Sequence, residues 1–194
     1  MSCTNRGETR KGHLFDYYIT PPQTAKEAFV ELIQLERTLQ NKYIKILDPC
    51  CGGDKIHNAT YKQLLFYMDY KFIDTMDIRE DSGADTKTNY LTYTAKQNYY
   101  DLIISNPPYT VALDFVQKAL LDVKDGGFVS YLLRLNFFGS QSRKKFFNQF
   151  MPKYCFVHSK RPSFTLDGKT DGTEYATFVW QKGRVDKCTI TKIL

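Results

Sequence analysis

The segment Asn106-Pro107-Pro108-Tyr109 combines residue types that could do chemistry on a planar amine. Two consecutive prolines stiffen the chain, so the Asn106 side chain and the Pro107 carbonyl would point in fixed directions. A carboxamide oxygen beside a backbone carbonyl can accept both hydrogens of an amine, which favours a tetrahedral nitrogen that can attack an electrophilic carbon. Tyr109 would stack on the planar group that carries the amine. The alternative is an ordinary proline-rich turn after a strand.

Two acidic residues upstream stand where a nucleotide could bind. Asp48 follows an apolar run and opens a turn that contains Gly52 and Gly53, and glycines let the backbone approach a nucleotide closely. Asp77 ends the next apolar run, where a carboxylate can accept hydrogen bonds from ribose hydroxyls. Either feature alone is common, because many strands end in glycine turns or in solvated carboxylates. Together with Asn106 they predict a nucleotide-like ligand at the carboxyl ends of successive strands.

The elements that must position these residues follow from the apolar pattern. The predicted strands are residues 43–48, 71–77, 101–106, 127–133, 154–159 and 175–181, and the predicted helices are 24–41, 111–123 and 140–150. Alternating strands and helices predict a doubly wound α/β fold with a mostly parallel, Rossmann-like sheet covered on both faces. Because residues 160–174 are polar and contain two glycines, the last two strands are expected to form an antiparallel hairpin at the sheet edge.

Composition restricts the class of protein. With 194 residues, 42% hydrophobic and 25% charged, the chain is expected to be one soluble globular domain, residues 1–194, whose residues 1–14 form a flexible basic arm. The net charge of +6 favours contact with a phosphate backbone. Five cysteines and three histidines show no metal-ligand spacing, which predicts no metal site and a cytoplasmic location. No apolar stretch approaches the length of about 18 residues that a membrane span needs, so no membrane partner is expected.

The order of these motifs resembles that of the amino-methylating DNA adenine methyltransferases, class I enzymes that use S-adenosylmethionine. The resemblance rests on Tyr18-Ile19-Thr20-Pro21-Pro22, the turn after Asp48, then Asp77 and Asn106-Pro107-Pro108-Tyr109. The chain looks especially like the small members carried by bacteriophages and prophages, and the similarity runs from about Tyr17 to Gly183. Three downstream stretches, residues 132–138, 161–164 and 168–171, are also similar. A doubly wound sheet that ends in a reversed hairpin is the architecture of these enzymes.

The resemblance implies transfer of a methyl group from S-adenosylmethionine to the exocyclic N6 amine of a flipped adenine in DNA. It assigns catalysis to Asn106, Pro107, Pro108 and Tyr109. It places the cofactor against Tyr18, Thr20, Pro21, Asp48, Pro49, Cys50, Gly52, Asp77, Ile78, Asn89, Tyr90 and Asn106. Asp77 would hold the ribose, and Asp48 would lie at the methionine end. Two positions depart from the pattern, because Asn89 stands where the family often has Asp, and Asp54 stands where it has Gly.

The candidates for DNA contact are Arg134, Arg161, Phe164 and Lys169. Arg134 would either order the flipped nucleotide or anchor the following loop, and Phe164 would either stack on a base or close the local core. A separate target-recognition domain is not expected, so recognition would come from the N-terminal arm, the loops, a partner protein or a second copy. Two other functions stay open. One is methylation of RNA or of a protein glutamine, and the other is a non-catalytic module that binds cofactor or DNA.

Overall fold

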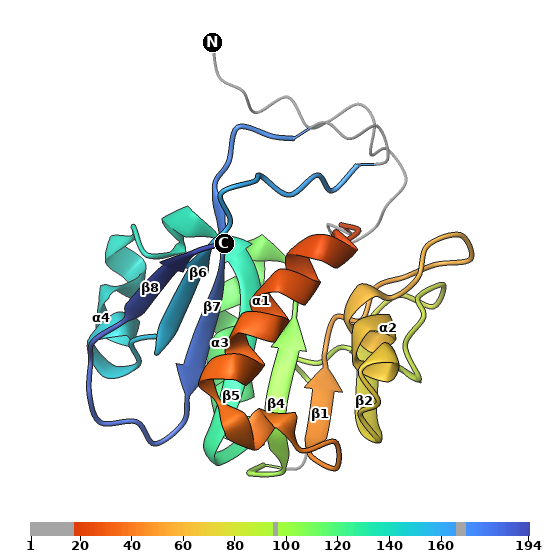
Figure 1. Ribbon diagram of the computed structural model, residues 1–194, viewed down its shortest axis with the longest axis horizontal. Coiled ribbons are helices and arrows are strands. Elements are labelled where there is room, and N and C mark those ends of the chain that lie inside the picture. The colour runs from red at the N-terminus through yellow and green to blue at the C-terminus, as the bar shows by residue number, and fades with distance from the viewer. Residues whose placement is uncertain (1–17, 95–96, 166–169) are drawn as a thin grey trace.

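The computed structural model describes residues 18–94, 97–165 and 170–194, and over these residues it shows one eight-stranded sheet flanked by helices (Figure 1). From one edge to the other the strands are β3 (Thr86–Lys87), β2 (Phe72–Asp77), β1 (Lys45–Asp48), β4 (Tyr100–Ser105), β5 (Val123–Arg134), β7 (Tyr175–Gln181), β6 (Tyr154–Val157) and β8 (Ile190–Ile193). Strands β2, β1, β4 and β5 pair in parallel, whereas β7 runs antiparallel to both β5 and β6. The predicted doubly wound fold with a C-terminal antiparallel hairpin is therefore confirmed.

Four α-helices cover the sheet in the described part of the chain. They are α1 (Pro22–Leu35), α2 (Thr60–Tyr67), α3 (Ala112–Asp122) and α4 (Gln141–Gln149). Helix α1 begins with Pro22, whose fixed φ suits a first helical turn. It ends at Leu35 because Glu36 leaves the helical region at φ −118° and ψ 85°, and a separate 3₁₀ turn follows at Arg37–Gln40. The single predicted helix over residues 24–41 was therefore wrong over its last third, residues 36–41, and α2 was not predicted.

The two faces of the sheet are covered by different helices. In β4, Leu102 and Ile104 pack in the same apolar cluster as Phe29 of α1. Ile103 points to the opposite face and packs in the cluster that contains Val116 of α3. All five side chains are at most 2% exposed. Burial on both faces explains why the central strands appear in the sequence as continuous apolar runs.

The edge of the sheet differs from the prediction. Strand β8 pairs in parallel with β6, with Tyr154 opposite Ile190, so β8 and not the hairpin forms this edge. All four residues of β8 are exposed. A short strand with two polar residues and no buried face carries little of the apolar signal on which sequence-based prediction depends. The hairpin itself forms as predicted, one strand further in.

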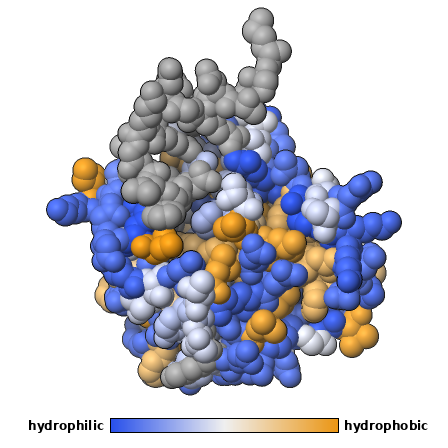
Figure 2. All heavy atoms as spheres, turned by 180° about the vertical axis from the view of Figure 1, so that it is seen from behind, coloured by the Kyte–Doolittle hydropathy of each residue, from blue (hydrophilic) through white to orange (hydrophobic). Residues whose placement is uncertain are grey.

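Parallel strands bring their carboxyl ends to the same edge of the sheet. Asp48, Asp77 and Ser105 end β1, β2 and β4, and Arg134 ends β5 in the same direction. The loops that carry the sequence motifs therefore meet above one edge, which is where doubly wound folds bind ligands. On the face seen from behind, hydrophobic residues lie in small groups separated by hydrophilic ones (Figure 2). Among the described helices, none has the length and apolar character that a bilayer crossing requires.

Candidate active site

A cavity of about 380 Å³ lies at the carboxyl ends of β1, β2 and β4. Eleven of the predicted site residues line it: Tyr18, Thr20, Pro49, Cys50, Gly52, Asp77, Ile78, Asn89, Tyr90, Asn106 and Pro108. The lining does not include Pro21, Asp48, Pro107 or Tyr109. Ile19 and Gly53, which belong to the sequence motifs, also line it, and the further lining residues that the sequence analysis missed are Cys51, Asn58, Thr60, Tyr61, Arg79, Thr88, Leu91, Thr110, Val111 and Phe115. The sequence motifs therefore meet at one concave site, and many of its walls come from residues between the motifs.

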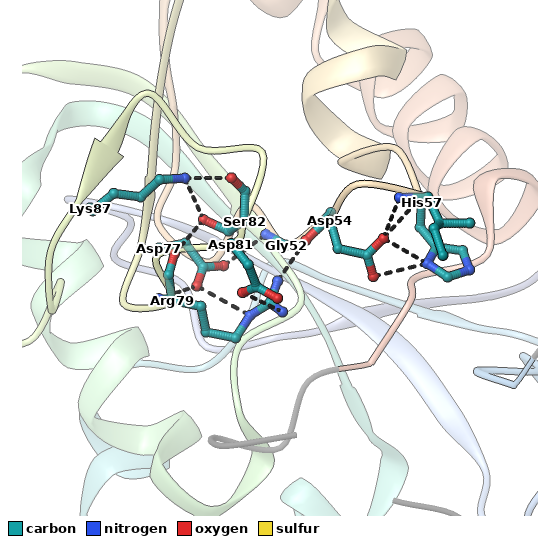
Figure 3. Close-up of polar contacts among 10 residues, drawn as sticks. Gly52, Asp54, His57, Asp77, Arg79, Asp81, Ser82 and Lys87 are labelled. Atoms are coloured by element: carbon teal, nitrogen blue, oxygen red, sulfur yellow. Dashed lines mark hydrogen bonds and ion pairs between the residues drawn. The ribbon is translucent and has the colours of Figure 1, made fainter. Parts of the chain in front are cut away.

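The glycine turn after β1 is tied to the end of β2. Gly52 and Gly53 adopt φ values of 66° and 76°, which side chains disfavour, and a Cβ on Gly53 would lie 2.9 Å from the Ala59 nitrogen. The Gly52 N–H donates to Asp77 Oδ2 at 2.8 Å (Figure 3). The carboxylate predicted to hold a ribose thus also fixes the turn that faces it.

Arg79 is a site residue that the sequence analysis missed. Its guanidinium donates to the Gly53 carbonyl at 2.6 Å and forms ion pairs with Asp77 and Asp81 at 3.6 Å and 3.2 Å (Figure 3). Its backbone N–H donates to Asp77 Oδ1 at 2.9 Å. With only 8% of Arg79 exposed, the charge is held between two carboxylates and a carbonyl. Arg79 therefore braces the glycine turn against β2, and no local motif in the sequence marks this role.

The structure explains the Asp at position 54. The Asp54 carboxylate accepts the backbone N–H groups of Ile56 and His57 at 2.8 Å and contacts His57 Nδ1 at 2.9 Å (Figure 3). Burial alone would raise the pKa of Asp54, but the hydrogen bonds from His57 and Ile56 lower it to about 2. The side chain does not line the cavity. Asp54 therefore stabilises its own loop. The glycines whose conformation allows the turn to pack closely are Gly52 and Gly53.

Asp48 lies buried beneath the cavity with no exposed surface. Its Oδ1 accepts the Ser105 hydroxyl at 2.6 Å and the Cys50 N–H at 3.2 Å, whereas its Oδ2 has no hydrogen-bond partner among the described residues. Burial raises the pKa of Asp48 to about 7, although these two hydrogen bonds oppose the rise. Burial also raises the pKa of the Cys50 and Cys51 thiols, which argues against a nucleophilic role for either cysteine.

The Asn106 carboxamide is held by the segment that precedes α1. Its Nδ2 donates to Thr20 Oγ1 at 3.1 Å, and the Thr20 carbonyl accepts the Thr60 hydroxyl at 2.7 Å. In this orientation Asn106 Oδ1 is buried and has no hydrogen-bond partner among the described residues. A buried acceptor without a donor costs about 1 to 3 kcal/mol, which a ligand amine could recover. Asn106 also lines the cavity, so its amide connects the cavity with the segment before α1.

Tyr109 belongs to an aromatic cluster with Tyr18, Phe164 and Tyr175. Its ring centroid lies 5.6 Å from that of Tyr18 and 5.7 Å from that of Tyr175, and Phe164 lies 5.6 Å from Tyr18 and 5.0 Å from Tyr175. Burial raises the pKa of Tyr109, with Tyr175 and Tyr18 adding to the rise and Arg134 and Asn106 opposing it. The rings already contact one another, so a base that stacks on Tyr109 must displace a neighbour.

The cluster favours one of the two predicted roles of Phe164, and the predicted DNA contacts stay predictions. Phe164 is 8% exposed and closes the local core, so in this structure its ring is not free to stack on a base. Arg161 is exposed and forms an ion pair with Glu174 at 2.5 Å. Lys169 and the arm of residues 1–14 lie outside the described residues. Arg161 is therefore the predicted DNA-contact residue that the structure places on the surface.

The far end of the cavity is aromatic. Tyr90 packs on Phe115 with ring centroids 5.4 Å apart, and its hydroxyl donates to the buried Asp122 at 2.7 Å. Asn89 accepts the Leu91 N–H through Oδ1 at 3.0 Å. Asn89 therefore stabilises its own turn and also lines the cavity. Among residues 18–94, 97–165 and 170–194, no group of three His, Cys, Asp or Glu side chains could hold a metal ion.

Comparison with solved structures identifies the fold. A candidate class I S-adenosylmethionine-dependent methyltransferase from Listeria monocytogenes matches with a TM-score of 0.64 and 18% identity, over 95% of this chain and 68% of that one. The methyltransferase subunit of a type I restriction-modification system from Streptococcus thermophilus matches with a TM-score of 0.70 and 12% identity, over 91% of this chain and 47% of that one. A candidate RNA methyltransferase from Pyrococcus horikoshii matches with a TM-score of 0.62 and 15% identity, over 87% of each chain.

No protein-family model and no curated protein matches the sequence. The chain spans about half of the length of the Streptococcus subunit. Sequence identities of 12 to 18% establish similarity of fold and not of substrate. The TM-scores of 0.62 to 0.70 over 87 to 95% of this chain show that it has the fold of the class I S-adenosylmethionine-dependent methyltransferases.

Proposed function

We propose that the protein transfers a methyl group from S-adenosylmethionine to the exocyclic N6 amine of adenine in DNA. The observation that carries the proposal is the buried Asn106 Oδ1, which has no hydrogen-bond donor among the described residues. It belongs to a side chain that lines the cavity, three residues before a tyrosine in an aromatic cluster. An acceptor between a nucleotide-sized cavity and a stacking tyrosine suits the amine of a planar base.

The cavity fits the proposed cofactor. Its volume of about 380 Å³ lies within the range of about 300 to 1,000 Å³ that is usual for small-molecule sites. Each Asp77 oxygen accepts one backbone N–H and keeps a further lone pair for a ribose hydroxyl. Tyr90, Ile78 and Phe115 line the cavity as apolar walls for an adenine ring. When bound, S-adenosylmethionine would supply an electrophilic methyl group on a positively charged sulfur.

The chain's own residues then act on the amine. We infer that Asn106 Oδ1 and the Pro107 carbonyl accept its two hydrogens and direct the nitrogen lone pair toward the methyl group. The carboxamide is already oriented by Thr20, so the Asn106 side chain need not turn when the base arrives. Transfer would form the new N–C bond as the C–S bond of the cofactor breaks, and the surplus proton would pass from the amine to water. Tyr109 holds the ring plane.

Charge and the fold comparisons favour DNA as the acceptor. The chain carries a net charge of +6, and one of the similar structures is a methyltransferase subunit of a restriction-modification system. Another is a candidate RNA methyltransferase, so RNA is the principal competing acceptor. Recognition of the target sequence by a partner protein or a second copy stays a prediction.

The proposal is tested by offering DNA, RNA and protein acceptors to the purified protein with isotopically labelled S-adenosylmethionine. The expected result is label in DNA, recovered as N6-methyl-2′-deoxyadenosine after digestion to nucleosides. The matched control is Asn106→Ala, which should bind cofactor but transfer little label. Label confined to RNA or protein would reject the DNA assignment, and a complete lack of cofactor binding would reject the function as a whole.

A further inference from the structure

Arg134 ends β5 beside the tyrosine that the proposed function assigns to the target base. Its guanidinium carbon lies 4.9 Å from the centroid of the Tyr109 ring. Its Nε is buried and has no hydrogen-bond partner among the described residues. A cation over an aromatic face is attracted by the ring's negative charge density, more strongly where water is excluded. The arginine therefore interacts with Tyr109 through the face of the ring.

The surrounding residues hold Arg134 in this place. It lies opposite Tyr175 in the β5–β7 pairing, and the Tyr175 hydroxyl donates to Asp171 at 2.9 Å. Burial and the hydrogen bond to Asp171 raise the pKa of Tyr175 to about 12, and the nearby guanidinium of Arg134 opposes that rise. Tyr175 also packs on Tyr109. Arg134, Tyr175 and Tyr109 therefore form one contiguous unit across three elements.

The ring of Tyr109 depends on such face contacts for its orientation. Its hydroxyl is buried and makes no hydrogen bond of good geometry with the described residues. Neighbours on the faces of the ring therefore restrain its orientation. These are Arg134, Tyr18 and Tyr175. Tyr18 and Tyr175 make tilted ring contacts with Tyr109. Arg134 is the charged member of the three, so it supplies the cation–π part of the restraint.

We propose that Arg134 positions Tyr109 for stacking on the target base and does not bind DNA phosphate. Arg134 is half-buried, with its Nε covered and its guanidinium carbon over the Tyr109 ring, whereas the exposed Arg161 is the candidate for a phosphate contact. The proposal rests on the proposed function, because it takes Tyr109 as the surface that receives the base. Of the two roles that the sequence left open for Arg134, ordering the flipped nucleotide or anchoring the following loop, it selects the first. Arg134 orders the nucleotide indirectly, through Tyr109.

The test compares Arg134→Met with Arg134→Lys. Arg161→Met is the comparison for a predicted phosphate contact, because Arg161 loses the same charge on the surface and pairs with Glu174 instead of Tyr109, and its expected effect is on the salt slope. Arg134→Met should lower the methyl-transfer kcat about tenfold, the factor typical of losing a partly desolvated cation–π contact. The slope of log DNA affinity against log salt should not change. Arg134→Lys should recover part of kcat, because a lysine can also place a cation over the ring.

The same substitution in a Tyr109→Leu background separates positioning from a general structural effect. Arg134→Met should then change kcat less than twofold further, since the ring that it positions is gone. A full tenfold loss in that background would overturn the proposal. So would a salt slope reduced by about 1 with kcat unchanged, because that result identifies a phosphate contact.

A measurement without DNA distinguishes failure of this proposal from failure of the proposed function. NMR of protein labelled with ¹³C in its tyrosine rings reports the surroundings of Tyr109 directly, with Tyr109→Phe used for assignment. Arg134→Met should shift and broaden the Tyr109 ring signal, and Arg161→Met should leave it in place. An unmoved signal in folded Arg134→Met would reject the positioning role even if methyl transfer to DNA is confirmed. A moved signal in a protein that methylates no DNA would reject only the proposed function.

Discussion

Replacing Asp48 with Asn should change how the stability of the protein depends on pH. The folded protein raises the pKa of this buried carboxyl from 3.8 to about 7. Between these values the folded state holds a proton that the unfolded chain has released, so the free energy of unfolding falls as pH rises. One pKa unit corresponds to about 1.36 kcal/mol, so the loss across this window is on the order of 4 kcal/mol. An Asn keeps the Oδ1 that accepts Ser105 and Cys50 but cannot ionise.

The assay is urea unfolding of both proteins at pH 5 and pH 8.5 without cofactor. We expect the wild type to lose about 3 kcal/mol more than Asp48→Asn between these two pH values, because only the part of the window from pH 5 to about 7 is sampled, and the variant to be the more stable protein at pH 8.5. Equal pH dependence in the two proteins would refute the reasoning, because it would mean that Asp48 titrates alike in the folded and unfolded states.

The same carboxyl should link cofactor binding to pH. The cofactor carries positive charge, and a cation near the buried Asp48 favours the ionised carboxylate. Wild-type affinity for S-adenosylmethionine should therefore increase as pH rises through about 7, with release of a proton on binding near that pH. Calorimetry in buffers of different ionisation enthalpy counts the proton. Asp48→Asn should release none from this site, and equal release by both proteins would contradict the link.

Three further substitutions test other parts of the site. Asp77→Ala should weaken cofactor binding by about 1 to 3 kcal/mol, because it removes a hydrogen-bonded carboxylate, and calorimetry showing unchanged affinity would place the ribose elsewhere. Asp54→Ala should lower the free energy of unfolding by about 1 kcal/mol, because the loop to His57 loses its cap, yet it should change cofactor affinity less than twofold; a tenfold loss of affinity would put Asp54 in the site. Arg161→Ala frees Glu174 and should reduce the slope of log DNA affinity against log salt by about 1 if Arg161 contacts one phosphate; an unchanged slope would remove it from the DNA surface.

The parts of the fold that the sequence predicted are those with strong apolar periodicity. β1 and β4 are buried on both faces, so their residues form apolar runs, and α3 presents one apolar face. Helix α2 was missed because it has only eight residues, of which one threonine and three aromatic residues have lower helix propensity, and packing on α1 holds it in place. β8 was missed because its four residues gain their order from pairing with β6 and not from burial.

In the site, too, the sequence predicted the residues that lie in local motifs and missed those that act through contacts distant in the sequence. Asn106 and Asp77 were found because the chemistry requires their residue types directly after strands. Arg79 and Arg134 act through contacts with residues far away in the sequence, at Gly53 and Tyr109, and no spacing rule predicts such pairs. The burial of Phe164 likewise follows from the packing of the hairpin on Tyr175, which the sequence left open as one of two roles.

The most direct test of the central claim is the single-turnover rate of methyl transfer to DNA by Asn106→Ala. We expect this rate to fall about 100-fold or more, because a preorganised polar group that acts on the transition state is removed. The Kd for S-adenosylmethionine should change much less than the rate, because most of the cavity wall stays in place. A folded Asn106→Ala protein that transfers methyl groups to DNA at nearly the wild-type rate would contradict the claim that Asn106 Oδ1 is the acceptor for the target amine.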